Sequence, residues 1–242
     1  MATATRPSQT PTLPVSDSTS RELPKADVPT PAPLPMPTST PTPNLYRISC
    51  ELYARIGELG LLGPKNKVVL LDGLLVNQMT KGPPHSSSLL RGLAAMQAAL
   101  PGGWHVRPEQ PIALRAGPDG DSVPEPDLMI VFGSLERYDH RHPEGTEVGI
   151  VVEVSSSPDA FRIDRAALAR YAHAGIPIAC IVNIPDRSIE VHTDPTGPAA
   201  VARYRTVATL RPGQVLAGEI GNATTGPAAL GPIAVEAFFA PL

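Results

Sequence analysis

The stretch GIVVEVSSS at residues 149–157 reads as a buried β-strand because nearly all of its first six residues are apolar, yet it holds one acid, Glu153. The residues that follow, SPDAFRIDRAALARYAHAG, carry apolar side chains at helical spacing and end at Gly175, a typical helix stop. IACIVNIPDRSIEVHTD then reads as a strand, a turn and a second strand. This half of the chain therefore predicts strands on both sides of one helix.

The preceding residues predict further elements of both kinds. YRISCELYARIGELGLLG predicts a helix, and KVVLLDGLLVNQM predicts a hairpin that turns at Asp72 and Gly73. In PPHSSSLLRGLAAMQAALPGGW, prolines and serines precede an amphipathic run, which is the pattern of a capped helix. Strands follow in WHVRPEQPIAL and PDLMIVFG. We predict an α/β (α+β) fold with a mixed sheet flanked by helices.

Proline marks the boundary of the folded part. Eleven of the 30 prolines lie in residues 1–44, mixed with Ser, Thr and Ala. Such a segment buries too little apolar surface to offset the entropy lost on ordering, so we predict a disordered tail over 1–44 and one domain over 45–242.

Charge and cysteine content restrict the function classes. The formal net charge is −3, so binding of nucleic acid would require a local basic patch. The two cysteines, Cys50 and Cys180, have no zinc-site or disulfide spacing, which favours a reduced, cytoplasmic setting. We expect no membrane span, because no apolar run approaches the roughly 20 residues that one requires.

Two acids stand where adjacent strands would bring them together. Asp127 begins the strand PDLMIVFG and Glu153 lies near the end of the strand GIVVEVS. If these strands pair antiparallel, the start of one lies opposite the end of the other and directly opposed side chains share a face. Adjacent carboxylates are costly without a cation, and Mg²⁺ commonly binds to one or two of them. Phosphodiester hydrolysis is the natural chemistry for such a pair.

Each acid also has a simpler explanation. Asp127 follows a proline-rich turn and could bond backbone N–H groups, as Asp often does there. Glu153 shares its face with Val151 and Ser155 and could point to solvent from a half-exposed strand. The residue pattern alone leaves these alternatives open.

The order of several short motifs resembles a known family. PPHS, PEPDLMIV, DHRHP, VVEVSSS, DRAALARYAHAGIP and IVNIPDRSIEV together are similar to the Uma-two family of restriction-endonuclease-like proteins, in the PD-(D/E)XK nuclease superfamily. The similarity runs from about residue 45 to the C-terminus.

The resemblance implies a metal-dependent endonuclease that hydrolyses DNA. Asp127 and Glu153 would be the metal ligands and catalytic acids, with Mg²⁺ or Mn²⁺ as cofactor. His85 matches the family's histidine before the second helix, where a proton carrier, a phosphate contact or a plain helix-entry residue are all compatible. The expected partner is DNA, and a homodimer is left open.

Three departures from the family pattern affect the site. The helix lysine expected before Tyr171 is replaced by Ala167, and the glutamate expected before the first hairpin turn is replaced by Val69. Ala179 and Cys180 replace an aromatic pair, which mainly changes packing. Loss of the lysine removes a cation, so the alternative is a non-catalytic, degenerate nuclease-fold module that binds nucleic acid or protein.

Two further groups of residues carry weaker signals. Arg162, Arg165 and Arg170 could form a basic strip, with Arg162 and Arg165 as phosphate contacts, although the neighbouring acids Asp159 and Asp164 make an ordinary helix surface equally compatible. Asp139, His140 and His142 have a spacing that could bind a transition metal, but a solvated loop that turns at Pro143 explains them more simply.

Overall fold

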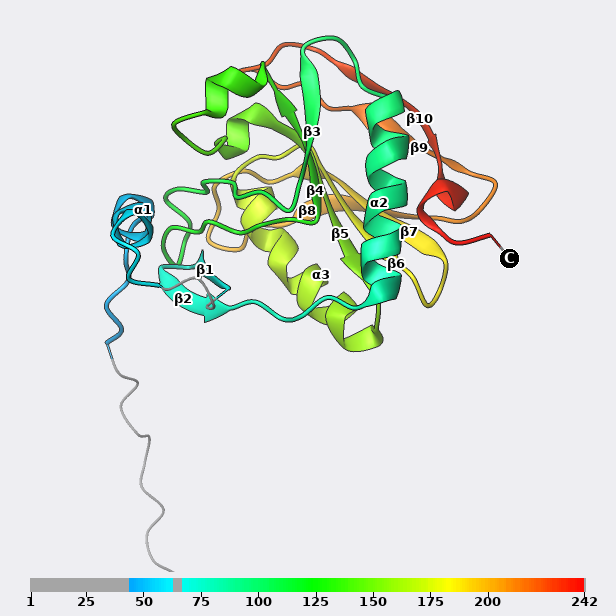
Figure 1. The fold of residues 1–242 in the computed structure, drawn as a ribbon. Coiled ribbons are helices and arrows are strands. Elements are labelled where there is room, and N and C mark those ends of the chain that lie inside the picture. Colours follow the sequence, from blue (N-terminus) through cyan, green and yellow to red (C-terminus); the bar gives the residue numbers. More distant parts are fainter. Residues whose placement is uncertain (1–43, 63–66, 242) are drawn as a thin grey trace, which may run out of the picture. The chain divides into compact units, whose positions relative to one another are not determined.

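The computed structural model describes residues 44–62 and 67–241. Except for Asn44, the tail predicted over 1–44 lies outside the described residues. Six strands form the main sheet in the order β3-β4-β5-β6-β7-β8, in which β5 and β6 run parallel and all other neighbours run antiparallel. The predicted mixed sheet flanked by helices is confirmed (Figure 1). Its strands are β3 (Trp104–Pro108), β4 (Leu128–Phe132), β5 (Val148–Ser155), β6 (Ile178–Asn183), β7 (Ser188–Pro195) and β8 (Tyr204–Leu210).

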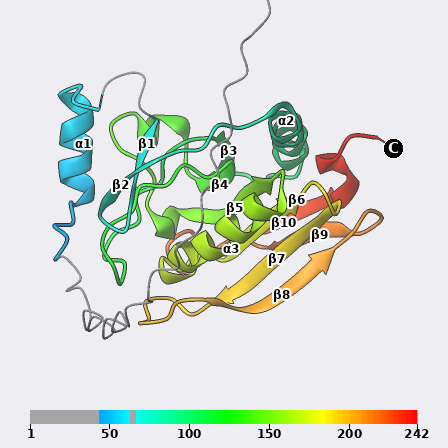
Figure 2. The ribbon, with the colours of Figure 1, turned by 90° about the horizontal axis from the view of Figure 1, so that it is seen from below.

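Two long helices cover the two faces of this sheet. Alternate residues of β4 and β5 enter separate apolar clusters, because successive side chains of a strand point to opposite faces. One cluster includes Leu89 and Met96 of α2 (Pro83–Ala98), and the other includes Leu168 and Tyr171 of α3 (Pro158–His173). The two helices accordingly lie on different sides of the sheet (Figures 1 and 2).

The smaller elements surround this core. Helix α1 (Cys50–Glu58) precedes the predicted hairpin of β1 (Val68–Leu71) and β2 (Leu74–Asn77), whose turn holds Asp72 and Gly73 at φ 51° and 74°. Strands β9 (Val215–Glu219) and β10 (Ala229–Ala234) form a second antiparallel pair. Short 3₁₀ helices span Leu135–Tyr138, Gly145–Glu147 and Val235–Phe238.

The predicted start of α2 is corrected. The prolines and serines do not precede the helix but form its first turn, and Gly82 at the N-cap position offers no side-chain hydrogen bond. Proline suits this turn because its fixed φ is helical and its missing N–H would have no intrahelical partner there. The helix therefore begins before His85, so that His85 projects from a fixed helical turn.

The structure can be compared with the expectations about membrane spans and cysteines. Within residues 44–62 and 67–241, no helix is long and apolar enough to cross a membrane. Cys50 and Cys180 are both free and buried.

Gly92 fixes how closely α2 approaches the C-terminal 3₁₀ helix. A Cβ at this position would lie 2.6 Å from the buried ring of Phe238. We expect Gly92→Ala to lower the free energy of unfolding by about 1–3 kcal/mol through overpacking. Gly57 in α1 is the matched control, because nothing lies within 4 Å of its added Cβ. Gly57→Ala should stabilise by up to about 1 kcal/mol. Urea unfolding measures the free energy of unfolding of both variants. Equal changes in Gly92→Ala and Gly57→Ala would contradict the close packing at Gly92.

Candidate active site

A cavity of about 490 Å³ opens where β4 begins and β5 ends. Its walls come from the β1–β2 hairpin, the segment that joins β2 to α2, the beginnings of α2 and β4, the end of β5 and helix α3. The polar side chains among its lining residues include Lys81, His85, Glu125, Asp127, Glu153, Asp164, Arg170 and Tyr171. The cavity therefore contains both acids of the predicted pair.

Strand pairing brings the two acids together. β4 pairs antiparallel with β5, with Leu128 opposite Val152, so Asp127 and Glu153 occupy the next opposed positions. The Asp127 backbone N–H lies 3.4 Å from Glu153 Oε2. Val151 and Ser155, which share a face with Glu153, are buried, so the half-exposed strand considered for Glu153 is wrong.

Asp127 is the most heavily contacted side chain of the site. Its Oδ1 lies 2.5 Å from the Lys81 ammonium, and its Oδ2 lies 2.9 Å from His85 Nε2. Oδ2 also accepts the backbone N–H of Val154 at 2.7 Å, so the bond to the backbone that we considered exists, but across strands rather than within a turn. Burial opposes ionisation, yet the His85 hydrogen bond and the Lys81 charge outweigh it and lower the pKa of Asp127. Asp127 is thus held as a carboxylate.

The pKa of Glu153 is shifted in the opposite direction to that of Asp127. Its Oε1 accepts a hydrogen bond of 2.7 Å from the Tyr171 hydroxyl, and its remaining exposure is toward the cavity that it lines. Burial, together with the charges of Asp127 and Asp164, raises the pKa of Glu153 well above its usual range. Two neighbouring carboxyl groups with opposed pKa shifts are typical of functional sites.

Asp164 of α3 is a third acid of the cavity. It accepts a 2.6 Å hydrogen bond from the Ser155 hydroxyl at the end of β5. Burial raises the pKa of Asp164, and the charge of Asp127 adds to this rise. The sequence interpretation treated Asp164 as a surface residue among arginines. Its position one helical turn before Leu168, which is buried, was the signal that it faces inward.

Val69 and Ala167, the two positions at which the resemblance leads us to expect a charged residue, face the same cavity. Val69 of β1 and Ala167 of α3 line it, whereas Ala179 and Cys180 are fully buried within β6.

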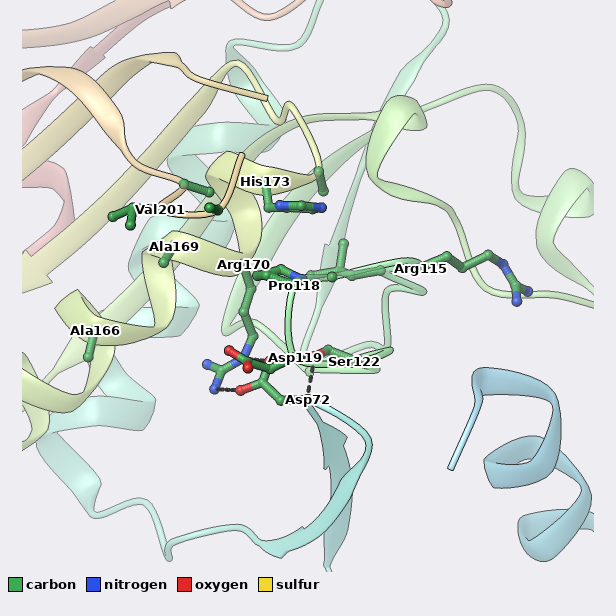
Figure 3. A pocket seen from close by; sticks show the side chains of 16 residues that line it. Asp72, Arg115, Pro118, Asp119, Ser122, Ala166, Ala169, Arg170, His173 and Val201 are labelled. Carbon is green, nitrogen blue, oxygen red and sulfur yellow. Dashed lines mark hydrogen bonds and ion pairs between the residues drawn. The ribbon is translucent and has the colours of Figure 1, made fainter. Parts of the chain in front are cut away.

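The helix arginines do not form a continuous basic strip. Arg162 is exposed and pairs with Asp159 at 2.6 Å, and Arg165 lies 3.4 Å from Glu190. Neither is among the residues that line the cavity. Arg170 does line it, but its guanidinium makes a bidentate pair of 2.9 and 2.6 Å with Asp72 at the hairpin turn (Figure 3). This pair fastens the hairpin to α3.

The cavity drawn in Figure 3 lies on the other side of that ion pair. It measures about 310 Å³ and is lined by Arg170, Asp72 and several alanines, including Ala166 and Ala169. Asp72 and Arg170 neutralise each other there. This cavity lacks the opposed acids of the other, so the larger cavity is the candidate active site.

The loop histidines contribute no ligand set. His140 and His142 are exposed, and Arg141 between them pairs with the buried Glu147 at 2.6 Å. Over the described parts of the chain, no group of three or more His, Cys, Asp or Glu side chains is placed to hold a metal ion.

A hard divalent cation nevertheless suits the donors of the cavity. Mg²⁺ needs only one or two protein carboxylates because it keeps several waters, and Asp127 and Glu153 occupy adjacent opposed positions at the cavity edge. Asp127 and Glu153 are the residues that would hold it.

The structure is an α/β protein with an acid-lined cavity, and sequence comparison gives its family. Residues 51–224 match the Uma2 family, described as "Putative restriction endonuclease". Because the match covers well over half of the 242 residues, the chain belongs to this family. The family description suggests a nuclease. A comparison with curated proteins finds no match.

Among solved structures, the chain is similar to the crystal structure of "a putative nuclease belonging to DUF820" from Anabaena variabilis ATCC 29413. The identity is 10% and the TM-score is 0.48, with 71% of this chain and 89% of the other covered.

Lys81 is the main residue of the site that sequence reasoning missed. It lies just before PPHS in the motif order, so its proximity to His85 was a usable signal. Tyr171 is also part of the site, since it is buried and its hydroxyl donates a hydrogen bond to Glu153.

Proposed function

We propose that this protein is a metal-dependent endonuclease that hydrolyses phosphodiester bonds in DNA. The observation that supports the proposal most is the opposition of Asp127 and Glu153 at the edge of one cavity, with opposed pKa shifts. Membership in the family supports the nuclease class. The substrate, the metal and the residue roles are the proposal.

The chain's own residues would each have a separate task. Asp127 and Glu153 hold the cation, which supplies Lewis-acid stabilisation and an activated water when bound. Tyr171 orients Glu153 through its 2.7 Å hydrogen bond. His85 orients Asp127 from α2, and its Nδ1 is buried without a hydrogen-bond partner among the described residues. Arg162 and Arg165 lie outside the cavity and are left as contacts to more distant phosphates.

Purified protein incubated with plasmid DNA tests the proposal. We expect nicking or linearisation with Mg²⁺ or Mn²⁺ and none with excess EDTA. Two free, buried cysteines fit a reducing, cytoplasmic setting for this activity. Gel filtration during purification would test the homodimer that the sequence leaves open.

A non-catalytic module is the second candidate function. The observation that favours it is the placement of Val69 and Ala167 on the cavity wall, where the family pattern has a glutamate and a lysine. The module predicts no metal-dependent cleavage at any protein concentration. It also predicts that Ala167→Lys with Val69→Glu would restore some cleavage, because the pair returns both charges to the wall.

A further inference from the structure

Lys81 reaches the site from a different part of the chain than Ala167 of α3. It lies in the connection between β2 and α2, and its ammonium lies 2.5 Å from Asp127 Oδ1 and 3.0 Å from Glu109 Oε1. The side chain is 35% exposed and lines the cavity. An ammonium on a flexible four-carbon stem can therefore reach both the acids and a molecule that enters the cavity.

Lysine is rare in this chain. There are four lysines and sixteen arginines, and of the lysines only Lys67 and Lys81 lie in the described parts. Arginine forms the other non-histidine ion pairs between described side chains, such as Arg170 with Asp72 and Arg137 with Glu147. The lysine of the site is thus an exception to how this chain otherwise places positive charge.

Both full cations that line the cavity are paired with acids, but Lys81 makes single contacts to two acids whereas Arg170 makes a bidentate pair with one. Of the residues that line it, Lys81 and Arg170 carry a full positive charge, and Arg170 is held in a bidentate pair by Asp72. The cavity also contains the Asp127 carboxylate, so an incoming phosphate would meet negative charge. Lys81 is the residue that can offset it by contact, since three ammonium donors suit phosphate oxygens.

We infer that Lys81 is the catalytic cation of this site: its ammonium contacts the scissile phosphate and stabilises the charge that develops there. It does so from the β2–α2 connection, in place of the helix lysine whose position Ala167 holds. The inference rests on the proposed nuclease function and assigns that function's missing cation.

Relocation of the charge tests this inference. Lys81→Met removes the ammonium but keeps the stem, and Lys81→Met with Ala167→Lys returns a lysine to the same cavity from α3. Lys67→Met is the matched control, because Lys67 is exposed and no ion pair joins it to a described acid. Cleavage of plasmid DNA at saturating substrate gives kcat, and fluorescence anisotropy of labelled duplex DNA in EDTA at several salt concentrations gives a readout that needs no catalysis.

We expect Lys81→Met to lower kcat about 10²–10³-fold, as loss of one transition-state donor does, and Lys67→Met to change it less than about threefold. In the double variant, the relocated lysine should raise kcat at least about tenfold above that of Lys81→Met. In EDTA, Lys81→Met should reduce the slope of log affinity against log salt by about 0.9, the value of one phosphate contact. Full activity of Lys81→Met, or no recovery in a folded double variant, overturns the inference.

The two proposals fail in different ways. If the wild-type protein cleaves no DNA, the nuclease function fails, and the EDTA titration then decides on Lys81 alone. If Lys81→Met leaves the slope of log affinity against log salt unchanged, Lys81 contacts no phosphate. That result would overturn the inference.

Discussion

Asp127→Ala and Glu153→Ala are each expected to abolish metal-dependent cleavage, with a loss of at least about 10²–10³-fold. Asp127 faces Glu153 across the start of β4 and the end of β5, so removal of either carboxylate removes one of the two proposed protein ligands. The remaining acid would no longer hold a cation against water, because Mg²⁺ dehydrates reluctantly and binds weakly to single carboxylates.

Isosteric variants separate chemistry from folding in this experiment. Asp127→Asn and Glu153→Gln keep the side-chain volume, so a loss of cleavage cannot come from a new void. Asp194→Asn is the control, since Asp194 pairs with Arg205 at the far strands β7 and β8 and lines none of the cavities described above. Gel assays of plasmid nicking give the rates. Cleavage at the wild-type rate by both alanine variants would contradict the assignment of Asp127 and Glu153 as metal ligands.

Glu153→Gln is expected to stabilise the metal-free protein at pH 8. Burial, Asp127 and Asp164 raise the pKa of Glu153 in the folded state above the roughly 4.3 of an unfolded glutamate. The folded state therefore binds more protons above that pH, and this residue's contribution to stability falls as pH rises toward the folded pKa. Glutamine carries no charge, so the variant does not lose this stability as pH rises.

The expected gain is about 2–4 °C in melting temperature at pH 8 in EDTA, which corresponds to about 1 kcal/mol in a domain of this size. At about pH 4.5 the gain should shrink, because the folded wild-type carboxyl then keeps its proton and the unfolded one is already partly protonated. Glu58→Gln on the exposed end of α1 is the control and should change little. Scanning calorimetry at both pH values checks the prediction, which a gain larger at pH 4.5 than at pH 8 would contradict.

Local patterns were sufficient to predict the three α-helices, the strands β1 to β7 and the pairing of the acids. The apolar run through Val151 and Val154 predicted β5, and the hairpin turn at Asp72 and Gly73 was predicted because its residue types tolerate a positive φ. The opposition of Asp127 and Glu153 followed from antiparallel neighbours in sequence. Each of these inferences needs only residues that are close in the chain or on adjacent strands.

Long-range contacts could not be predicted in the same way. Arg170 pairs with Asp72 across 98 positions, and Lys81 reaches Asp127 across 46. Both depend on where a hairpin and a connecting segment fold back over the sheet, and periodicity does not determine that placement. The start of α2 was mispredicted because the sequence PPHSSS is compatible with a cap or with a first turn.

Metal binding to the paired carboxylates is the central claim, and titration calorimetry with Mn²⁺ tests it most directly. We expect the wild-type protein to bind Mn²⁺ in the cavity, and we expect Glu153→Gln and Asp127→Asn to lose that heat. Both results would place the cation between these two side chains. No binding by the wild-type protein at millimolar Mn²⁺ would contradict the claim and favour the non-catalytic module.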